Sequence, residues 1–588
     1  MKQPQEHRKA HKLTAELLFS ENGTDFLLSF FTLKRQKKTG KSFLSCLSLL
    51  SWTFSLYSAL SDSRFNLSEK SSLQAAMGLF CHDSVHQRQT EAGQRQIPFT
   101  GGRDSFIFRL HPSACFDTIK PPSKTGRNEE IGMKDYRIEH DVLGEVKVPA
   151  DACWMSQTQR SLENFRIGQE KMPASLIRAF ALLKMACAIA NYDEKKITLE
   201  QKEAIIEVCQ AILAGEYADQ FPLSVWQTGS GTQTNMNVNE VISHIANEKA
   251  GRKLLHPNDT VNCSQSSNDT FPAALHMMCA LEVRNSLFPA LDHIIDVLHS
   301  LEEKNRGLIK IGRTHLQDAT PLYFSDEISG WTSMMEHSRR QLEAVLPFVY
   351  ELAIGATAVG SQINAPEGFG EHVCALLKEQ TGIPFKRDPN YFHALTSKDA
   401  CALLSGALKA LGANAMKMAN DVRWLASGPR CGIGEIRIPA NEPGSSIMPG
   451  KVNPTQSEAL TMVAVQVMGN DAAVGFAASQ GNFELNVFMP VIAYNLHQSI
   501  TLLSDALVSF TDNCLCGLEA DAEKMEKNLN SSLMLVTCLN PVIGYENAGK
   551  AARYAYENGL SLKEALLSLN LLTKEEFDTY VRAEKMVR

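Results

Sequence analysis

Apolar residues recur at helical spacing through the middle of this chain. The stretch from Met277 to Lys304 carries them close to the 3.6-residue period of a helix, at Leu281, Leu287, Leu291, Ile295, Leu298 and Leu301. Residues 400–426 and 459–478 are rich in Ala, Leu and Met and contain few helix breakers. Long helices with so little charge bury more than one face. These segments therefore predict a helical bundle and a subunit interface.

At 588 residues the chain is too long for one compact core, and its pattern predicts three domains. We expect short strands mixed with helices over 133–265, the helical bundle over 266–521, and short helices over 522–588. Turn signals at Asn540-Pro541 and Asn558-Gly559 divide the last of these domains. The sequence thus predicts a mainly α fold around a central bundle of long helices.

Residues 1–132 lack this periodicity and differ from the remainder in charge. They contain 18 Lys+Arg and 12 Asp+Glu, a net +6, which leaves 40 against 53, a net −13, for residues 133–588. We interpret residues 1–132 as a leader that is disordered or is not part of the functional protein. A targeting segment and a membrane anchor are alternatives, because Phe43–Ser61 is an uncharged apolar run of 19 residues behind a basic cluster. Six serines in that run argue against a span, so we expect no membrane association.

Composition excludes several classes of function. The formal net charge of −7 gives no reason to expect a nucleic acid partner. The 14 cysteines are scattered, and the close pair Cys514 and Cys516 does not have metal-ligand spacing. We therefore expect reduced, buried thiols in the cytoplasm, no iron–sulfur cluster, and neither a metal nor a cofactor. A mitochondrial location is the alternative if the leader is a targeting segment.

The loop from Gly444 to Pro454, with the sequence GSSIMPGKVNP, holds the most distinctive chemistry. Its two hydroxyls, one ammonium and one amide could close over a small anion and deliver a proton-abstracting oxygen. Removing a proton from the carbon beside a carboxylate requires a base at that carbon and cations or donors on the carboxylate oxygens. Lys451 and Asn453, two residues apart, can reach the same carboxylate.

Four further polar segments accompany this loop: Trp226–Asn237, His256–Asp259, Ser264–Asp269 and Gly312–Pro321. In this order and spacing they resemble the signature blocks of class II fumarases, the metal-independent members of the fumarase/aspartase superfamily. The resemblance runs from about Lys134 to the C-terminus. It implies the three-domain fold of that superfamily, a small dicarboxylate substrate, and the reversible hydration of fumarate to (S)-malate in the tricarboxylic acid cycle. It also implies a homotetramer whose active sites each draw on three subunits.

The resemblance also implies a role for each matching residue. Ser445 would be the base that forms an aci-carboxylate intermediate, His315 would activate water or protonate the leaving hydroxyl, and Glu458 would orient His315. The residues implied to bind substrate are Ser230, Thr232, Ser266, Ser267, Asn268, Thr314, Ser446, Lys451 and Asn453. A secondary anion site is implied at His256, Asn258 and Asp259, for which the turn at the start of a helix is the alternative explanation.

Two other functions remain open. An aspartate ammonia-lyase of the same superfamily would share most of the loop, although the residues that follow it, Thr455-Gln456-Ser457-Glu458, are fumarase-like. A non-catalytic scaffold derived from the superfamily, as some lens proteins are, is the second alternative. The joint presence of Ser445, Lys451, Asn453 and His315 argues against it.

Overall fold

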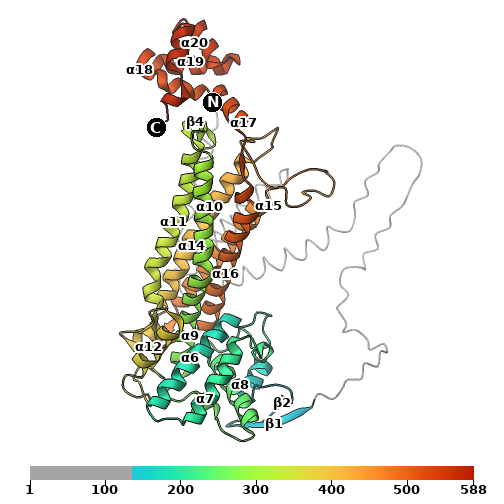
Figure 1. Ribbon diagram of the computed structural model, residues 1–588, viewed down its shortest axis with the longest axis vertical. Coiled ribbons are helices and arrows are strands. Elements are labelled where there is room, and N and C mark those ends of the chain that lie inside the picture. Colours follow the sequence, from blue (N-terminus) through green and yellow to red (C-terminus); the bar gives the residue numbers. More distant parts are fainter. Residues whose placement is uncertain (1–134, 588) are drawn as a thin grey trace, which may run out of the picture. The chain divides into compact units, whose positions relative to one another are not determined.

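The computed structural model describes residues 135–587 (Figure 1). The chain divides into two units, Met1–Gly126 and Arg127–Arg588, and every described residue belongs to the second. The leader expected over residues 1–132 lies outside the described residues, so the interpretation of that segment stays a prediction.

The described chain begins with a hairpin and a group of short and medium helices. Strands β1 (Tyr136–Asp141) and β2 (Gly144–Pro149) pair antiparallel, with Tyr136 opposite Pro149. The helices that follow are α5 (Ser156–Asn164), α6 (Ala174–Asp193), α7 (Leu199–Leu213), the short η1 (Ala218–Gln220), α8 (Thr232–Ala250) and η2 (Pro257–Val261). This region therefore mixes a strand pair with helices, as the sequence predicted.

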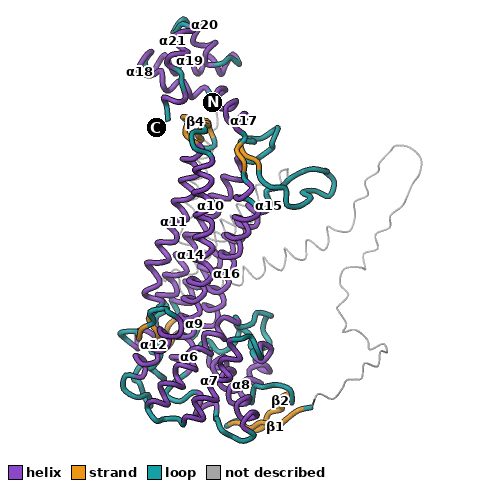
Figure 2. Tube along the Cα trace, viewed as in Figure 1, coloured by secondary structure: helices purple, strands orange, loops and turns teal. Residues whose placement is uncertain are grey.

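Five long helical segments form the bundle, and they confirm the predicted mainly α fold. They are α9 (Ser267–Glu282) continued through η3 (Val283–Leu287) into α10 (Phe288–Lys304), then α11 (Phe324–Val349), α14 (Asp399–Leu425), α15 (Thr455–Ala478) and α16 (Met489–Asn513). Helix α14 packs against α11 and α15, and α16 packs against α10 and α15. Figure 2 shows that the strands are short and lie outside the long helices. The three apolar stretches in the sequence correspond to α9–α10, α14 and α15.

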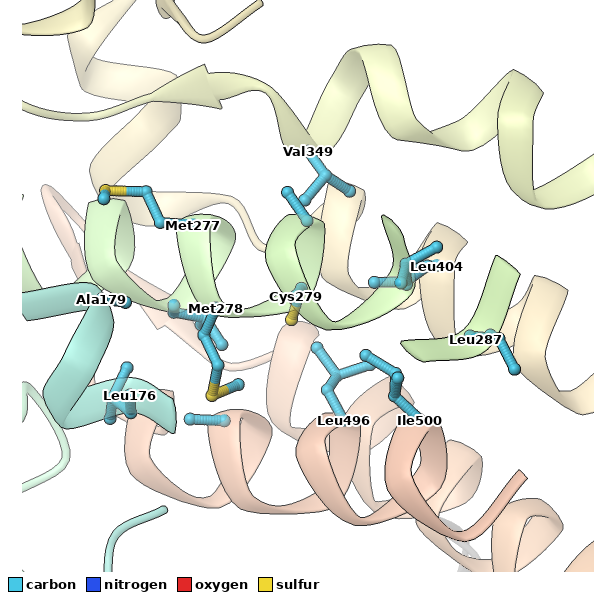
Figure 3. Close-up of a cluster of buried hydrophobic side chains, with 14 of the residues drawn as sticks. Leu176, Ala179, Met277, Met278, Cys279, Leu287, Val349, Leu404, Leu496 and Ile500 are labelled. Carbon is cyan, nitrogen blue, oxygen red and sulfur yellow. The ribbon is translucent and has the colours of Figure 1, made fainter. Parts of the chain in front are cut away.

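The core of the bundle is built from side chains of distant segments. Figure 3 shows Leu176 and Ala179 of α6 beside Met278 of α9, with Leu496 of α16 close by, while Met277 projects from the other side of α9. All five residues are buried. Burying each large apolar side chain contributes about 1.5–3 kcal/mol, so this contact between three helices is a major source of stability.

Between the bundle helices lie short elements that shape its ends. The hairpin of β3 (Ile309–Thr314) and β4 (Gln317–Tyr323) joins α10 to α11. The others are β5 (Glu351–Leu352), α12 (Phe369–Thr381), β6 (Lys386–Arg387), α13 (Tyr391–Thr396), β7 (Ile436–Arg437), β8 (Gly481–Asn482) and β9 (Leu485–Asn486). Strand β5 pairs parallel with β6, and β8 pairs antiparallel with β9.

The C-terminal segment is a set of short helices with its own small core. It contains η4 (Leu515–Gly517), β10 (Glu519–Ala520), α17 (Ala522–Ser531), η5 (Leu533–Leu539), α18 (Asn540–Ile543), α19 (Tyr545–Asn558), α20 (Leu562–Ser568), α21 (Lys574–Tyr580) and η6 (Ala583–Lys585). Gly559 ends α19 at φ 64°, as its turn signal predicted. Asn540-Pro541 instead starts the single-turn helix α18, because proline is tolerated in the first helical turn, where its missing N–H costs no bond.

Helix α15 is unusual for its exposure. Among residues 135–587, α6 and α15 are the helices long and apolar enough to cross a bilayer. In α6, 67% of the apolar window is buried within the protein, as in a core helix, whereas in α15 only 28% is buried. Helix α15 therefore carries an apolar face that the rest of the described chain leaves uncovered.

Candidate functional site

The loop between β7 and α15 is closed on itself by its own backbone. The Gly444 N–H donates to the Lys451 carbonyl at 3.1 Å, and the Asn453 side-chain amide donates to the Gly444 carbonyl. A Cβ at position 444 would lie 2.1 Å from the Lys451 oxygen, so only glycine fits there. These contacts hold the two ends of the loop together and leave its middle exposed.

Ser445 lies where an oxyanion would be stabilised. Its Oγ accepts hydrogen bonds from the backbone N–H of Met448 at 3.0 Å and of Ile447 at 3.3 Å. Two N–H donors on one oxygen favour its negatively charged form. Ser446 follows on the exposed side of the loop, and the exposed ammonium of Lys451 makes no ion pair with any residue that the structure describes. The loop thus combines a potential base with a cation that is available to an anionic substrate.

Glu458 occupies the first turn of α15, directly after the loop. Its N–H donates to the Pro454 carbonyl at 3.0 Å, and its carboxylate is exposed at the N-terminal end of the helix. Within residues 135–587 no hydrogen bond or ion pair joins it to His315. The expected pairing of these two side chains is therefore not made inside one chain.

Thr314 and His315 lie at the tip of the β3–β4 hairpin. His315 and Leu316 have φ values of 57° and 59°, the left-handed conformation that a tight two-residue hairpin turn requires at both positions. Residues with a Cβ adopt this conformation at a cost, which marks the turn as a functional candidate. Both Thr314 and His315 are exposed, so the hairpin presents them to a partner or ligand.

A second set of candidate residues gathers where α8 and α9 begin. The hydroxyl oxygens of Ser230 and Thr232 lie 2.8 Å apart at the start of α8. Gly231 between them has φ 72°, and a Cβ there would lie 2.0 Å from the Phe271 ring on α9. The glycine therefore allows α8 to start directly against α9.

Ser266, Ser267 and Asn268 cap α9 next to that turn. The Ser266 Oγ accepts from the Asn268 N–H at 3.2 Å, and the Asn268 amide donates to the Ala358 carbonyl at 2.8 Å. The Ser267 Oγ accepts at 3.0 Å from the amide of Asn235, which lies one turn after Thr232 on α8. The structure thus brings the Ser230 and Ser266 blocks together, as the implied substrate site requires.

Asp269 completes the cap of α9 from a fully buried position. Burial raises the pKa of its carboxyl to about 6, although the N–H groups of Ser266, Thr357 and Gly355 favour the charged form. This carboxylate holds the 355–357 segment against the start of α9. It therefore supports Ser266–Asn268 from behind without being exposed to a ligand.

The two sets of candidate residues lie at opposite ends of long helices. From Ser267 to Lys304, α9, η3 and α10 form 38 helical residues, which span about 57 Å at 1.5 Å per residue. The His315 hairpin follows the far end. The Ser445 loop precedes α15, and the chain returns after α15 to Met489, whose N–H donates to the carbonyl of Gly229 beside Ser230. The length of α15 therefore separates the Ser445 loop from Ser230. One chain therefore cannot assemble the complete set of implied residues.

The implied secondary anion site is a helix start. His256 caps η2, and its Nδ1 accepts from the Asp259 N–H at 3.2 Å and lies 3.1 Å from the Asp259 carboxylate. Asn258 is exposed in the same turn. The structure therefore places the three residues together in the helix-start turn that the sequence left open as an alternative, and nothing in this geometry requires an anion.

Several buried and half-buried polar residues beneath the second set were not singled out from the sequence. The group consists of Lys184, Asn235, Asn262 and Gln265, linked by hydrogen bonds of 2.9–3.2 Å. Asn235 and Gln265 belong to the quoted polar segments. Lys184 lies in the middle of helix α6, in which Arg178 and Asp193 are the other charged residues. A lysine in the middle of a mostly apolar helix was the available signal.

No group of three or more His, Cys, Asp or Glu side chains within residues 135–587 has the arrangement of a metal site. The eleven described cysteines are all free thiols, and burial raises the pKa of most of them, as for Cys209 to about 12. The two sets of candidate residues carry hydroxyl, amide, imidazole, ammonium and carboxylate groups.

Comparisons with known proteins agree with this arrangement. Residues 144–469 match the Lyase family, and residues 535–588 match the fumarase C C-terminus family. The class II fumarate hydratase of Bacillus cereus is 59% identical over 457 residues, covering 77% of this chain and 99% of that protein. A class II fumarate hydratase of Helicobacter pylori is 57% identical with the same coverage.

Solved structures give the same result. The crystal structure of recombinant class II fumarase from Schistosoma mansoni superposes with a TM-score of 0.76 at 41% identity, covering 77% of this chain and 99% of the other. A fumarate lyase:delta crystallin from Brucella melitensis reaches a TM-score of 0.73 at 37% identity, with the same coverage. This chain is a member of the class II fumarate hydratase family.

Proposed function

We propose that the protein catalyses the reversible hydration of fumarate to (S)-malate. One structural observation carries this proposal. Ser445 holds its oxygen between two backbone N–H donors on a loop that also presents the free ammonium of Lys451. Two relatives that align with this chain over 99% of their own length, at 59% and 57% identity, are class II fumarate hydratases. Their similarity supports the same reaction for this chain.

The loop provides the chemistry of proton removal. Ser445, as its alkoxide, takes the proton from the carbon beside a malate carboxylate, and the electron pair moves onto that carboxylate to form the aci-carboxylate. Lys451 and Asn453 stabilise this doubly negative group, because their donors meet charge that is greater in the transition state than in the substrate. Ser446 adds a further hydroxyl donor.

His315 and Glu458 provide the proton transfer that accompanies loss or addition of water. The imidazole of His315, oriented by the Glu458 carboxylate, protonates the leaving hydroxyl and activates water in the reverse direction. Neutral donors bind the substrate oxygens without introducing like-charge conflict. These are Ser230, Thr232, Ser266, Ser267, Asn268 and Thr314.

The site requires several copies of the chain, and we propose a homotetramer with D2 symmetry. The two sets of residues lie at opposite ends of α9–α10, so another copy must supply what each end lacks. The uncovered apolar face of α15 is a suitable contact surface, with Met462, Val465 and Phe476 exposed by 67%, 61% and 76%. We also propose His256, Asn258 and Asp259 as a secondary anion site of this assembly.

We place the enzyme in the cytoplasm, where reduced thiols such as those of the described cysteines are maintained. A mitochondrial location follows instead if residues 1–132 are a targeting segment. The division into 133–265, 266–521 and 522–588 is proposed as the domain organisation of the enzyme.

Absorbance spectroscopy tests the proposed activity directly. With (S)-malate as substrate, the conjugated double bond of fumarate should appear, and treatment with a chelator should not abolish the reaction. An aspartate ammonia-lyase would instead release fumarate from aspartate and leave malate unchanged. Turnover of aspartate alone, or of neither compound, would contradict the proposal.

A further inference from the structure

A buried lysine lies behind the proposed substrate site. Lys184 is 1% exposed, and its ammonium donates to the side-chain oxygens of Gln265 at 2.9 Å and Asn262 at 3.2 Å. It lies on α6, which packs along α9, as the neighbouring residues in Figure 3 show for an earlier turn of α6. Burying an ammonium is costly, so its retention calls for a specific role.

The hydrogen bonds of Lys184 continue to a substrate-binding hydroxyl. The Asn262 oxygen also accepts from the amide of Asn235 at 3.1 Å and from that of Asn239 at 3.1 Å. The second hydrogen of the Asn235 amide goes to the Ser267 Oγ at 3.0 Å. Three bonds therefore connect the Lys184 ammonium to Ser267.

Two groups of fixed polarity contact Asn262 in this series of hydrogen bonds: the Lys184 ammonium, and the Gln265 backbone carbonyl, which accepts from the Asn262 NH2 at 3.2 Å. A side-chain amide can exchange its oxygen and its NH2 by rotating through half a turn, and a hydroxyl can donate or accept, but an ammonium can only donate. Lys184 requires the oxygen of Asn262 to face it, and the Gln265 carbonyl, which takes the NH2 end, favours the same orientation. That oxygen requires the NH2 end of Asn235, and the NH2 makes Ser267 an acceptor on its buried side.

The hydroxyl hydrogen of Ser267 is left to point away from the network. Among residues 135–587 it has no hydrogen-bond acceptor, and the side chain is half-buried beside Ser266 and Asn268. We propose that Lys184 is a positioning residue that fixes the Ser267 hydroxyl as a donor toward a substrate carboxylate. The inference rests on the proposed assignment of Ser267 to the substrate site.

Charge supports the same arrangement. The pKa of Lys184 is lowered to about 8 by burial, which the nearby Cys187, Asp269 and Cys209 oppose, so the ammonium persists at neutral pH. A site built from neutral donors thus has a cation behind it, separated from the proposed substrate position by the side chains of Asn262, Asn235 and Ser267. This cation favours an anionic ligand without forming an ion pair that would have to break on product release.

Steady-state kinetics of the full-length assembled enzyme test the proposal through a double-mutant cycle. Lys184→Met and Ser267→Ala should each raise the KM for malate about ten-fold, with a smaller change in kcat. A ten-fold weaker affinity is what the loss of one hydrogen bond to a charged group produces. Because both remove the same donor, the double variant should have a KM close to that of Ser267→Ala alone.

Lys398→Met is the matched control. Lys398 is also 1% exposed, but its ammonium donates to the carbonyls of Ala394, Leu395 and Ser397 and makes no contact with the proposed substrate residues. This variant should lose stability and keep the KM of the parent. An equal rise in KM for both lysine variants would show that loss of a buried charge, and not positioning of Ser267, causes the effect.

Distinct outcomes separate the two proposals. A normal KM for Ser267→Ala would overturn the substrate site and this inference with it. A raised KM for Ser267→Ala that multiplies with the effect of Lys184→Met would overturn only the positioning role. If Lys184→Met fails to assemble, Asn235→Asp tests whether the Ser267 hydroxyl must be a donor toward the substrate. The new carboxylate would accept the Ser267 hydroxyl hydrogen, which would then no longer point toward the substrate. This variant should also raise KM, and a normal KM would contradict the inference.

Discussion

The guanidinium of Arg313 donates two hydrogen bonds to the fully buried carboxylate of Glu435, at 2.6 and 3.0 Å. Lys310 on the same strand lies 3.3 Å from this carboxylate, and Asn528 of α17 donates to it at 2.9 Å. Burial opposes ionisation, yet the hydrogen bond from Arg313 and the charge of Lys310 hold the pKa of Glu435 below its usual value. One carboxylate thus joins the His315 hairpin, the segment before the Ser445 loop and the C-terminal helices.

Glu435→Gln should therefore destabilise the protein strongly. The substitution leaves the half-buried guanidinium of Arg313 without its carboxylate and leaves Glu327, at 2.7 Å, as the remaining anion beside the buried Lys310. Losing the charged partner of a buried ion pair costs about 3 kcal/mol in unfolding free energy. The exposed pair Arg553–Glu557 provides a control, because solvent screens it and Glu557→Gln should leave the unfolding midpoint nearly unchanged. Thermal unfolding measures both. Equal midpoints for the two variants would show that the buried cluster is not a structural joint.

Substitutions in the catalytic set should separate binding from chemistry. Ser445→Ala should lower kcat by about three orders of magnitude or more with a smaller effect on KM, because it removes an interaction of the transition state. Lys451→Met should impair both kcat and KM, since the ammonium meets the carboxylate in both states. His315→Asn should lower kcat. Near-normal turnover by Ser445→Ala would require another base.

Mixed assemblies test whether each site draws on several copies. Ser445→Ala and a Ser267→Ala/Asn268→Ala variant should each be weakly active alone. Unfolded together at equal amounts and reassembled, they should recover about a quarter of the parental activity, because that share of sites receives an intact contribution from both copies.

A matched mixture distinguishes this result from simple stabilisation. Ser445→Ala mixed with Lys451→Met should recover nothing, since both changes lie in the same loop and every site then holds one of them. If the first mixture also stayed inactive, or if a fully active monomer were found by sedimentation, the shared site would be refuted.

Stability should fall in mild acid because of His276 on α9. Its Nδ1 lies 2.8 Å from the Glu351 carbonyl, and burial, reinforced by the charge of Lys398, lowers its pKa to about 4. In the unfolded chain the pKa of this histidine is near 6.5. Between about pH 4 and pH 6.5 the unfolded chain therefore binds more protons at His276 than the folded protein does. This contribution is fully present above about pH 6.5, is lost as pH falls toward 4, and amounts to about 3 kcal/mol.

Comparison with His276→Gln isolates that contribution from other titrating groups. The stability difference between parent and variant should shrink steadily between pH 6.5 and 4, measured by urea unfolding at several pH values. A difference that does not change with pH would show that His276 does not remain neutral in the folded protein.

Removing residues 1–132 should leave the enzyme intact. The alignment with the Bacillus cereus relative includes 99% of that protein but 77% of this chain. All candidate site residues lie within residues 135–587. A protein that begins at Met133 should therefore fold, assemble and turn over malate like the full chain. Loss of activity on truncation, or recovery of the intact full-length chain in the membrane fraction, would contradict this expectation.

Local features of this protein could be predicted from its sequence because they depend on residues close together in the chain. Helical periodicity located α10, α14 and α15, since the packing of an α-helix repeats every few residues. The glycines and prolines around Ser445 indicated a loop, and the structure closes it through contacts between Gly444 and residues 451 and 453. The start of α9 at Ser266 follows from a cap within four residues.

Only the tertiary structure decided which of these features meet. The length of α9–α10 separates Ser267 from His315, which the order of blocks along the chain does not reveal. The link from Lys184 to Ser267 joins α6, α8 and the start of α9, whose contacts depend on how distant helices pack. Periodicity specifies which face of a helix is buried, but the partner of that face is chosen by the packing of the whole bundle.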